Sequence, residues 1–156
     1  MSYTNEVNLI FESRSQNEGF ARVVAASFAA QLDPTLEELE DIRTAVSEAV
    51  TNAIIHGYEG KNGKIHMKCQ IENDIFRVVV EDEGCGIKDL SQAMEPMYTS
   101  RPELERSGMG FSFMEIFMDK LEVTSEYGKG TSVFMEKRIG LGKSIFESPD
   151  WQLGQN

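Results

Sequence analysis

The chain has few cysteines, no long hydrophobic run and no recognisable export signal. Its 156 residues include only two cysteines, Cys69 and Cys85, which are too few for a secreted disulfide scaffold, and no cysteine–histidine cluster has zinc-site spacing. No segment reaches the roughly 20 apolar residues that cross a bilayer. The first residues lack the basic and apolar regions of a secretory signal. We therefore expect a cytoplasmic protein that does not associate with membranes.

Positive charge is also in short supply. The 15 lysines and arginines stand against 26 aspartates and glutamates, so the formal net charge is −11. Nucleic-acid binding needs a basic face that neutralises phosphates, so no direct nucleic-acid partner is expected, whereas basic protein surfaces suit this charge. The length, with 40% hydrophobic and 26% charged residues, fits a single globular domain.

Apolar periodicity predicts the elements of the first half. Residues 5–12 alternate as a strand, and residues 18–32 predict a helix, because the apolar residues Phe20, Val23, Val24, Phe28 and Leu32 fall at helical spacing. A capping-box pattern at Thr35 opens a second helix, which ends near Gly57. Its apolar stripe is Leu39, Ile42, Val46, Ala49, Val50 and Ala53.

Hairpins dominate the second half. Residues 65–71 alternate strictly and pair with 75–81 across a short turn, and residues 121–127 pair with 131–138. Between them lie a long segment without periodicity, which is typical of a functional lid, and a helix at 108–120. The order β-α-α-β-β-lid-α-β-β predicts an α+β two-layer sandwich, with a mostly antiparallel, mixed sheet covered by helices on one face.

Three glycine-rich segments could hold a phosphate. Gly142-Lys143-Ser144 lacks the upstream glycine of a P-loop, and Gly84-Cys85-Gly86 lacks the third glycine of a dinucleotide fingerprint. Gly108-Met109-Gly110 precedes a helix, whose free N–H groups and dipole suit an anion. Taken alone, a flexible hinge explains that segment equally well.

Two further features carry chemistry only in combination. Glu48 and Asn52 are four residues apart, so they share one face of the second helix, off its apolar stripe. Taken alone, the pair is best explained as part of a solvent-exposed side of the helix. The alternative is a carboxylate base beside an amide oxygen that could ligate a hard cation. Asp82 follows an apolar strand and precedes Gly84-x-Gly86, which is either an ordinary turn or an acceptor for an exocyclic amine beside room for a flat ring.

In this order the motifs resemble the ATP-binding fold shared by gyrase B, histidine kinases and MutL. Within it the chain is similar to the bacterial anti-sigma factor serine kinases, most closely the sporulation anti-sigma-F type. The resemblance covers about residues 5–140 and is carried by Asn17-Glu18-x-Phe20-Ala21-Arg22-Val23, Gln31-Leu32-Asp33-Pro34-Thr35, the segment from Val46 to Tyr58, and the segment from Pro102 to Phe111.

The resemblance implies a role for each matching residue. Glu48 would be the general base toward a partner's serine, with Arg106 also catalytic, and Asn52 would hold Mg²⁺. Asp82 would accept from the adenine amine, and the lid, about residues 88–110, would cover the phosphates. The implied ATP-binding set is Asn52, Asp82, Gly84, Gly86, Thr99, Arg101, Ser107, Gly108, Met109, Gly110 and Thr131.

The resemblance also implies the biology. ATP and Mg²⁺ would be the cofactors, and the partners would be a sigma-F-type sigma factor and an anti-anti-sigma protein with a STAS domain, contacted on a surface that includes Arg22. A homodimer is implied as well. Residues 1–140 would form the kinase domain and 141–156 a C-terminal tail. The alternatives are a nucleotide-gated anti-sigma module with little kinase activity and a general-stress-type anti-sigma kinase.

Overall fold

The computed structural model describes residues 4–95 and 110–140. In these ranges five strands form one sheet in the order β1-β2-β3-β5-β4, and every strand pairing is antiparallel. In chain order the elements are β1 (Thr4–Glu12), α1 (Ser15–Ala29), the 3₁₀ turn η1 (Ala30–Leu32), α2 (Leu36–Asn52), the π-helical turn η2 (Ala53–Gly57), β2 (Lys64–Glu72), β3 (Ile75–Asp82), α3 (Leu90–Ala93), α4 (Gly110–Phe117), β4 (Lys120–Glu126) and β5 (Gly130–Arg138).

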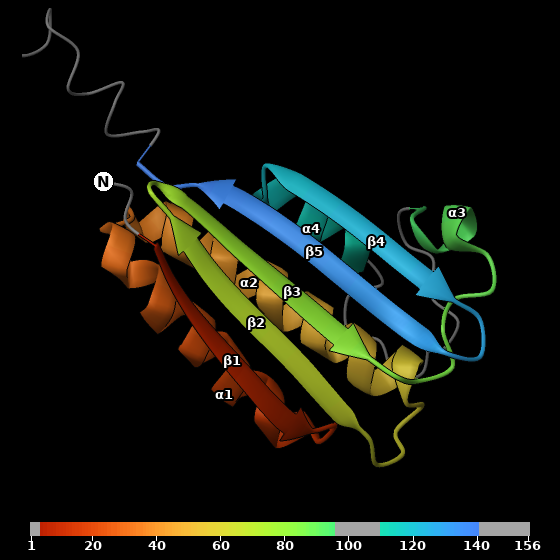
Figure 1. Ribbon diagram of the computed structural model, residues 1–156. Coiled ribbons are helices and arrows are strands. Elements are labelled where there is room, and N and C mark those ends of the chain that lie inside the picture. Colours follow the sequence, from red (N-terminus) through yellow and green to blue (C-terminus); the bar gives the residue numbers. More distant parts are fainter. Residues whose placement is uncertain (1–3, 96–109, 141–156) are drawn as a thin grey trace, which may run out of the picture.

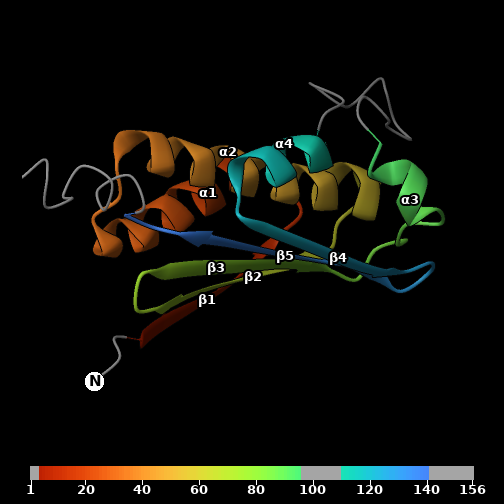
Figure 2. The same cartoon turned by 90° about the horizontal axis from the view of Figure 1, so that it is seen from above.

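Helices and sheet form two layers. α1, α2 and α4 lie on one face of the sheet, and no described helix covers the opposite face (Figures 1 and 2). The predicted α+β sandwich is thereby confirmed, with an antiparallel sheet.

The core follows from alternation along the central strands. In β2 the side chains of Ile65, Met67, Cys69 and Ile71 are buried, whereas their neighbours on the strand are partly or fully exposed. β3 continues the pattern with buried Phe76, Val78 and Val80. Successive strand residues point to opposite faces, so this alternation gives the sheet one apolar face for the helices.

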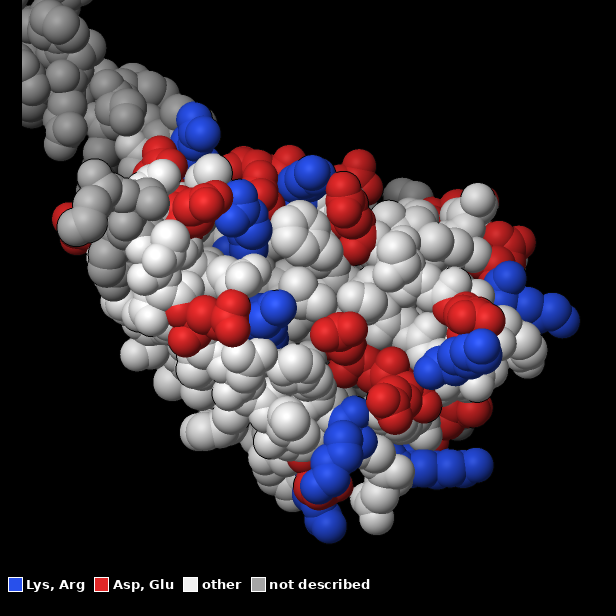
Figure 3. Space-filling view, viewed as in Figure 1, with Lys and Arg blue, Asp and Glu red and all other residues white. Residues whose placement is uncertain are grey.

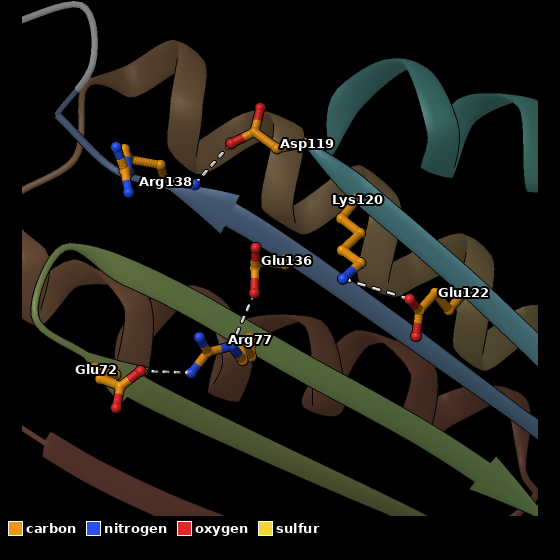
Figure 4. A network of polar contacts seen from close by, with 7 residues as sticks. All are labelled: Glu72, Arg77, Asp119, Lys120, Glu122, Glu136 and Arg138. Atoms are coloured by element: carbon orange, nitrogen blue, oxygen red, sulfur yellow. Dashed lines mark hydrogen bonds and ion pairs between the residues drawn. The ribbon is translucent and has the colours of Figure 1, made fainter.

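The uncovered face of the sheet carries paired charged side chains. Acidic and basic side chains are interspersed over it (Figure 3). Arg77 on β3 lies between two carboxylates (Figure 4): its Nε donates to Glu136 at 2.8 Å and its Nη1 to Glu72 at 3.2 Å. These contacts join β2, β3 and β5 on the face that the described helices leave open.

Helix α2 begins as predicted. The Glu38 backbone N–H donates to Thr35 Oγ1 at 3.1 Å, and the Thr35 N–H donates to Glu38 Oε1 at 2.8 Å, so the capping box is complete. Ile42, Val46 and Val50 are fully buried between the sheet and the other helices. This apolar side fixes the rotation of α2 and therefore the direction in which Glu48 and Asn52 leave it.

The predicted apolar stripe of residues 18–32 faces the core only in part: Val24, Phe28 and Leu32 pack against it, whereas Phe20 and Val23 are each 55% exposed. The fully buried residues of α1 are instead Ala21, Ala25, Ala26 and Ala29. Alanine lets a helix approach its neighbour closely, and α1 packs against α2 through this small-residue side. The larger apolar residues of α1 lie partly or fully at the surface as a result.

The structure refines three details of the predicted elements. α4 ends at Phe117, because Lys120 already begins β4. The short helix α3 occupies part of the segment predicted to lack periodicity. The second helix ends in the π-helical turn η2, with Asn52 as the last α-helical residue.

Candidate functional site

A cavity of about 890 Å³ opens where α2 ends, β3 ends and α4 begins. This volume falls within the range of small-molecule sites. Five of the predicted site residues line it, although they are spread over 80 positions of the sequence: Asn52, Asp82, Gly86, Gly110 and Thr131. The sheet explains part of this convergence, because the last residue of β3, Asp82, pairs with Thr131 near the start of β5.

Asp82 is a half-buried acid in the cavity wall. The Gly84 N–H donates to its Oδ1 at 2.9 Å. Burial raises the pKa of the Asp82 carboxyl above its ordinary value of 3.8, and hydrogen bonds from the backbone of Gly84 and Thr131 oppose this rise. A carboxylate held at the end of a strand in a partly apolar cavity can accept from a ligand's N–H group.

Glycine is required beside Asp82 for close packing. A Cβ at Gly84 would lie 2.0 Å from the carbonyl oxygen of Gly57, the last residue of η2. The next residue continues the contact, because the Cys85 N–H donates to the same oxygen at 2.8 Å. The loop after β3 is therefore pressed against the end of the second helix.

The other side of this loop is held by the β4–β5 hairpin. Gly86 has a φ of +73°, and a Cβ there would lie 2.2 Å from the carbonyl oxygen of Glu126. The Gly128 N–H donates to the Cys85 carbonyl at 2.6 Å. Ser125 Oγ accepts from the Ile87 N–H at 2.7 Å and lies 2.8 Å from Thr131 Oγ1. Loop 84–87 is thus fixed from two sides mainly through main-chain atoms.

Glu48 does not line the cavity itself but lies next to its rim. Its Oε2 is 3.5 Å from the position that a Cβ on Gly110 would take, and Gly110, the first residue of α4, lines the cavity. The preceding residue, Ser47, donates a hydrogen bond to Glu18 on α1. Helix α2 therefore presents Asn52 to the cavity and Glu48 to its edge, one helical turn apart.

The remaining predicted residues are separate from this group. Arg22 lies on α1, outside the cavity lining, with its Nη1 3.7 Å from Glu18 Oε1. Gly84 contributes its backbone to Asp82 rather than a cavity wall. The predicted residues Thr99, Arg101, Arg106, Ser107, Gly108 and Met109 lie outside the described residues, as do the greater part of the predicted lid and the tail after residue 140.

Sequence reasoning missed part of the lining. His56 lines the cavity, as does Cys85, whose Sγ donates to the His56 carbonyl at 3.0 Å. Residues 87–93, including α3, form another wall. A short helix without apolar periodicity gives no sequence signal. His56, by contrast, comes four residues after Asn52, and this spacing could have indicated that both side chains lie on the same side of the second helix.

Within residues 4–95 and 110–140, no helix is long and apolar enough to span a membrane. In the same ranges no three histidine, cysteine, aspartate or glutamate side chains gather as a metal-binding cluster.

Comparison of the fold with solved structures gives matches at low sequence identity. The RsbU and RsbW domains of a Mycobacterium tuberculosis protein match with a TM-score of 0.62 and 17% identity, over 86% of this chain and 32% of that chain. The histidine kinase domain of the Erythrobacter litoralis blue-light-activated histidine kinase matches with a TM-score of 0.54 and 22% identity, over 82% and 64%. At this identity the matches establish the fold alone.

Comparison of the sequence gives the family. The family model of the histidine kinase-like ATPase domain matches residues 11–137. The anti-sigma F factor of Clostridium acetobutylicum is 58% identical over 137 residues, which cover 88% of this chain and 96% of that protein. The anti-sigma F factor of Thermoanaerobacter sp. is 59% identical over 143 residues, which cover 92% and 100%. The chain therefore belongs to the histidine kinase-like ATPase domain family and, within it, to the anti-sigma F factors.

Proposed function

We propose that the cavity binds ATP and that the protein is a serine kinase that also sequesters a sigma-F-type sigma factor. The observation that carries the proposal is the convergence of Asn52, Asp82 and Thr131 on one cavity in a chain of the ATPase-domain family. The half-buried Asp82 carboxylate would accept from the adenine amine. The close packing of Gly84 against Gly57 and of Gly86 against Glu126 would hold the neighbouring loop in place beside the ring.

The residues present suit a magnesium ion. Mg²⁺ keeps several waters and uses one or two protein oxygens together with substrate phosphates, so it needs no cluster of carboxylates. The Asn52 side-chain oxygen, at the cavity end of α2, would be the protein ligand. When bound, the ion would neutralise phosphate charge.

Transfer would proceed from this arrangement. The serine hydroxyl oxygen of the anti-anti-sigma protein attacks the γ-phosphorus, its proton passes to Glu48, and the bond from the γ-phosphorus to the ADP oxygen breaks. Arg101, Arg106 and the backbone of residues 107–110 would neutralise the charge on the phosphates, which is the main protein contribution to phosphoryl transfer. The position of Glu48 beside Gly110, at the start of α4, supports its assignment as the base.

The partner assignments rest on the family. The relatives are anti-sigma F factors, so the sigma factor would be of the sigma-F type and the phosphorylated antagonist an anti-anti-sigma protein with a STAS domain. Arg22, whose side chain on α1 is partly exposed and lies near Glu18, would belong to the partner surface. We further propose that the protein acts as a homodimer.

Replacing the base tests the kinase assignment. With ATP, Mg²⁺ and the anti-anti-sigma protein, Glu48→Gln should lower the rate of serine labelling by about 10²- to 10⁴-fold, the usual contribution of a general base, with ATP affinity retained. Glu40→Gln is the matched control on α2, because the Glu40 side chain is 64% exposed and pairs with Arg43 on the same helix. An unchanged labelling rate in Glu48→Gln would rule out Glu48 as the base. A tight sigma complex with no labelling by the wild type would favour a binding module.

A further inference from the structure

Lys137 connects three elements at the end of α4 that lies away from the cavity. Its Nζ donates to the carbonyl oxygen of Phe117, the last residue of α4, at 2.8 Å. The same nitrogen lies 3.4 Å from Asp41 Oδ2 on α2. Lys137 itself belongs to β5 and follows Val133 and Met135 on the strand's helix-facing side. One ammonium group thus joins β5, α2 and the C-terminal end of α4.

This contact is less exposed than the ion pairs on the uncovered sheet face. The Lys137 and Asp41 side chains are 12% and 23% exposed, whereas those of Lys120 and Glu122 are 53% and 59% exposed. Exposed pairs contribute little because water screens them. The Lys137 ammonium is mostly removed from water and contacts a carboxylate and the carbonyl at the end of a helix. The dipole of α4 also favours a positive charge at this C-terminal end.

The other end of α4 reaches the cavity. α4 has eight residues, so it is about 12 Å long, and its first residue, Gly110, lines the cavity beside Glu48. In so short a helix a shift at one end changes the position of the other. Asp41 lies seven residues before Glu48 on α2, which is about two turns, so both side chains leave α2 on nearly the same side.

We propose that Lys137 is a positioning residue for the phosphates of the nucleotide. By holding the Phe117 carbonyl and Asp41 together, it fixes the angle of α4 relative to α2. It therefore fixes the distance from the start of α4 to Asn52 and Glu48. The inference rests on the proposed function, in which the start of α4 faces the phosphates. The adenine end is held by different contacts, those of Asp82 and loop 84–87, so Lys137 acts on the phosphates and leaves the adenine pocket unchanged.

Calorimetric titration with two ligands tests this separation. Wild type, Lys137→Met and the control Lys68→Met, which removes a lysine from the uncovered face of β2, are each titrated with ATP plus Mg²⁺ and with adenosine. Lys137→Met should weaken ATP binding by about 5- to 20-fold, the usual size of a coupling between separate positions. Its adenosine affinity should change by less than about two-fold. Lys68→Met should match the wild type for both ligands.

The outcomes distinguish a failure of the Lys137 proposal from a failure of the proposed function. Unchanged ATP affinity in Lys137→Met, or equal losses for ATP and adenosine, would overturn the positioning role, because a loosened fold affects both ligands alike. If Lys137→Met does not fold, Asp41→Asn decides, with an expected ATP-specific loss of about two- to five-fold. If the wild type binds ATP no better than adenosine, the proposed function itself fails.

Discussion

The contact between loop 84–87 and η2 gives the sharpest test of the site's construction. Gly84→Ala adds a single methyl group that would lie 2.0 Å from the Gly57 carbonyl oxygen and 2.3 Å from its carbonyl carbon. Both are backbone atoms in a buried turn and cannot rotate away, so the loop and η2 must separate. This separation would also stretch the 2.8 Å hydrogen bond from Cys85 N–H to Gly57.

The expected cost follows from these two effects. Overpacking a tight contact costs about 1–3 kcal/mol, and a weakened buried hydrogen bond adds about 0.5–1.5 kcal/mol. Gly84→Ala should therefore lower the free energy of unfolding by about 2–4 kcal/mol. Because Gly84 N–H also donates to Asp82, nucleotide affinity should fall as well.

Urea denaturation with and without ATP measures both effects. The matched control is Gly19→Ala on α1, where the new methyl group lies no closer than 3.7 Å to its nearest neighbour. This control should stabilise the protein by about 0.5–1 kcal/mol, since alanine is the better helix former. If Gly84→Ala unfolds at the wild-type urea concentration with unchanged ATP affinity, the close packing of this loop does not determine the site.

Other features give smaller, separate effects. Because burial raises the pKa of the Asp82 carboxyl, its ionised form costs stability above that raised pKa. Asp82→Asn should therefore raise the melting temperature at neutral pH, by an amount that shrinks as the pH falls toward 3.8, while nucleotide binding is lost; thermal scans across pH and calorimetry check this. Thr35→Ala removes the N-cap acceptor of α2 and should cost about 1 kcal/mol in urea denaturation, against a smaller loss for Thr35→Ser. Arg77→Met breaks the contacts to Glu72 and Glu136 and should cost about 1 kcal/mol, since both ion pairs remain partly in contact with water, which weakens them; a loss that did not diminish in 1 M salt would contradict a mainly electrostatic origin.

Elements with a clear period were predictable from the sequence, and those decided by packing were not. The alternation of residues 65–71 and the capping box at Thr35 appear in the structure as predicted. In α1, periodicity placed Phe20 and Val23 in the apolar stripe, yet the close approach of α1 to α2 buries alanines instead. A helical pattern counts small and large apolar residues alike. Which of them become buried depends on the distance to the neighbouring helix.

The site was predictable only through family resemblance. Asn52, Asp82 and Thr131 are each ordinary at their own positions, and no local rule brings them together. The antiparallel register that places Asp82 opposite Thr131 is a property of the folded sheet. The wall formed by residues 87–93 and the cavity position of His56 needed the structure, because a four-residue helix and a single histidine carry too little pattern.

The hydrogen bond from Gly128 to Cys85 has a consequence for how this chain can vary. Gly128 sits in the turn of a hairpin whose tip would otherwise tolerate insertions, as surface turns usually do. Here an added residue would move the donor away from loop 84–87 and loosen one wall of the cavity without altering any side chain that faces it. The length of this turn, and not only its composition, should therefore be restricted in any working version of the protein.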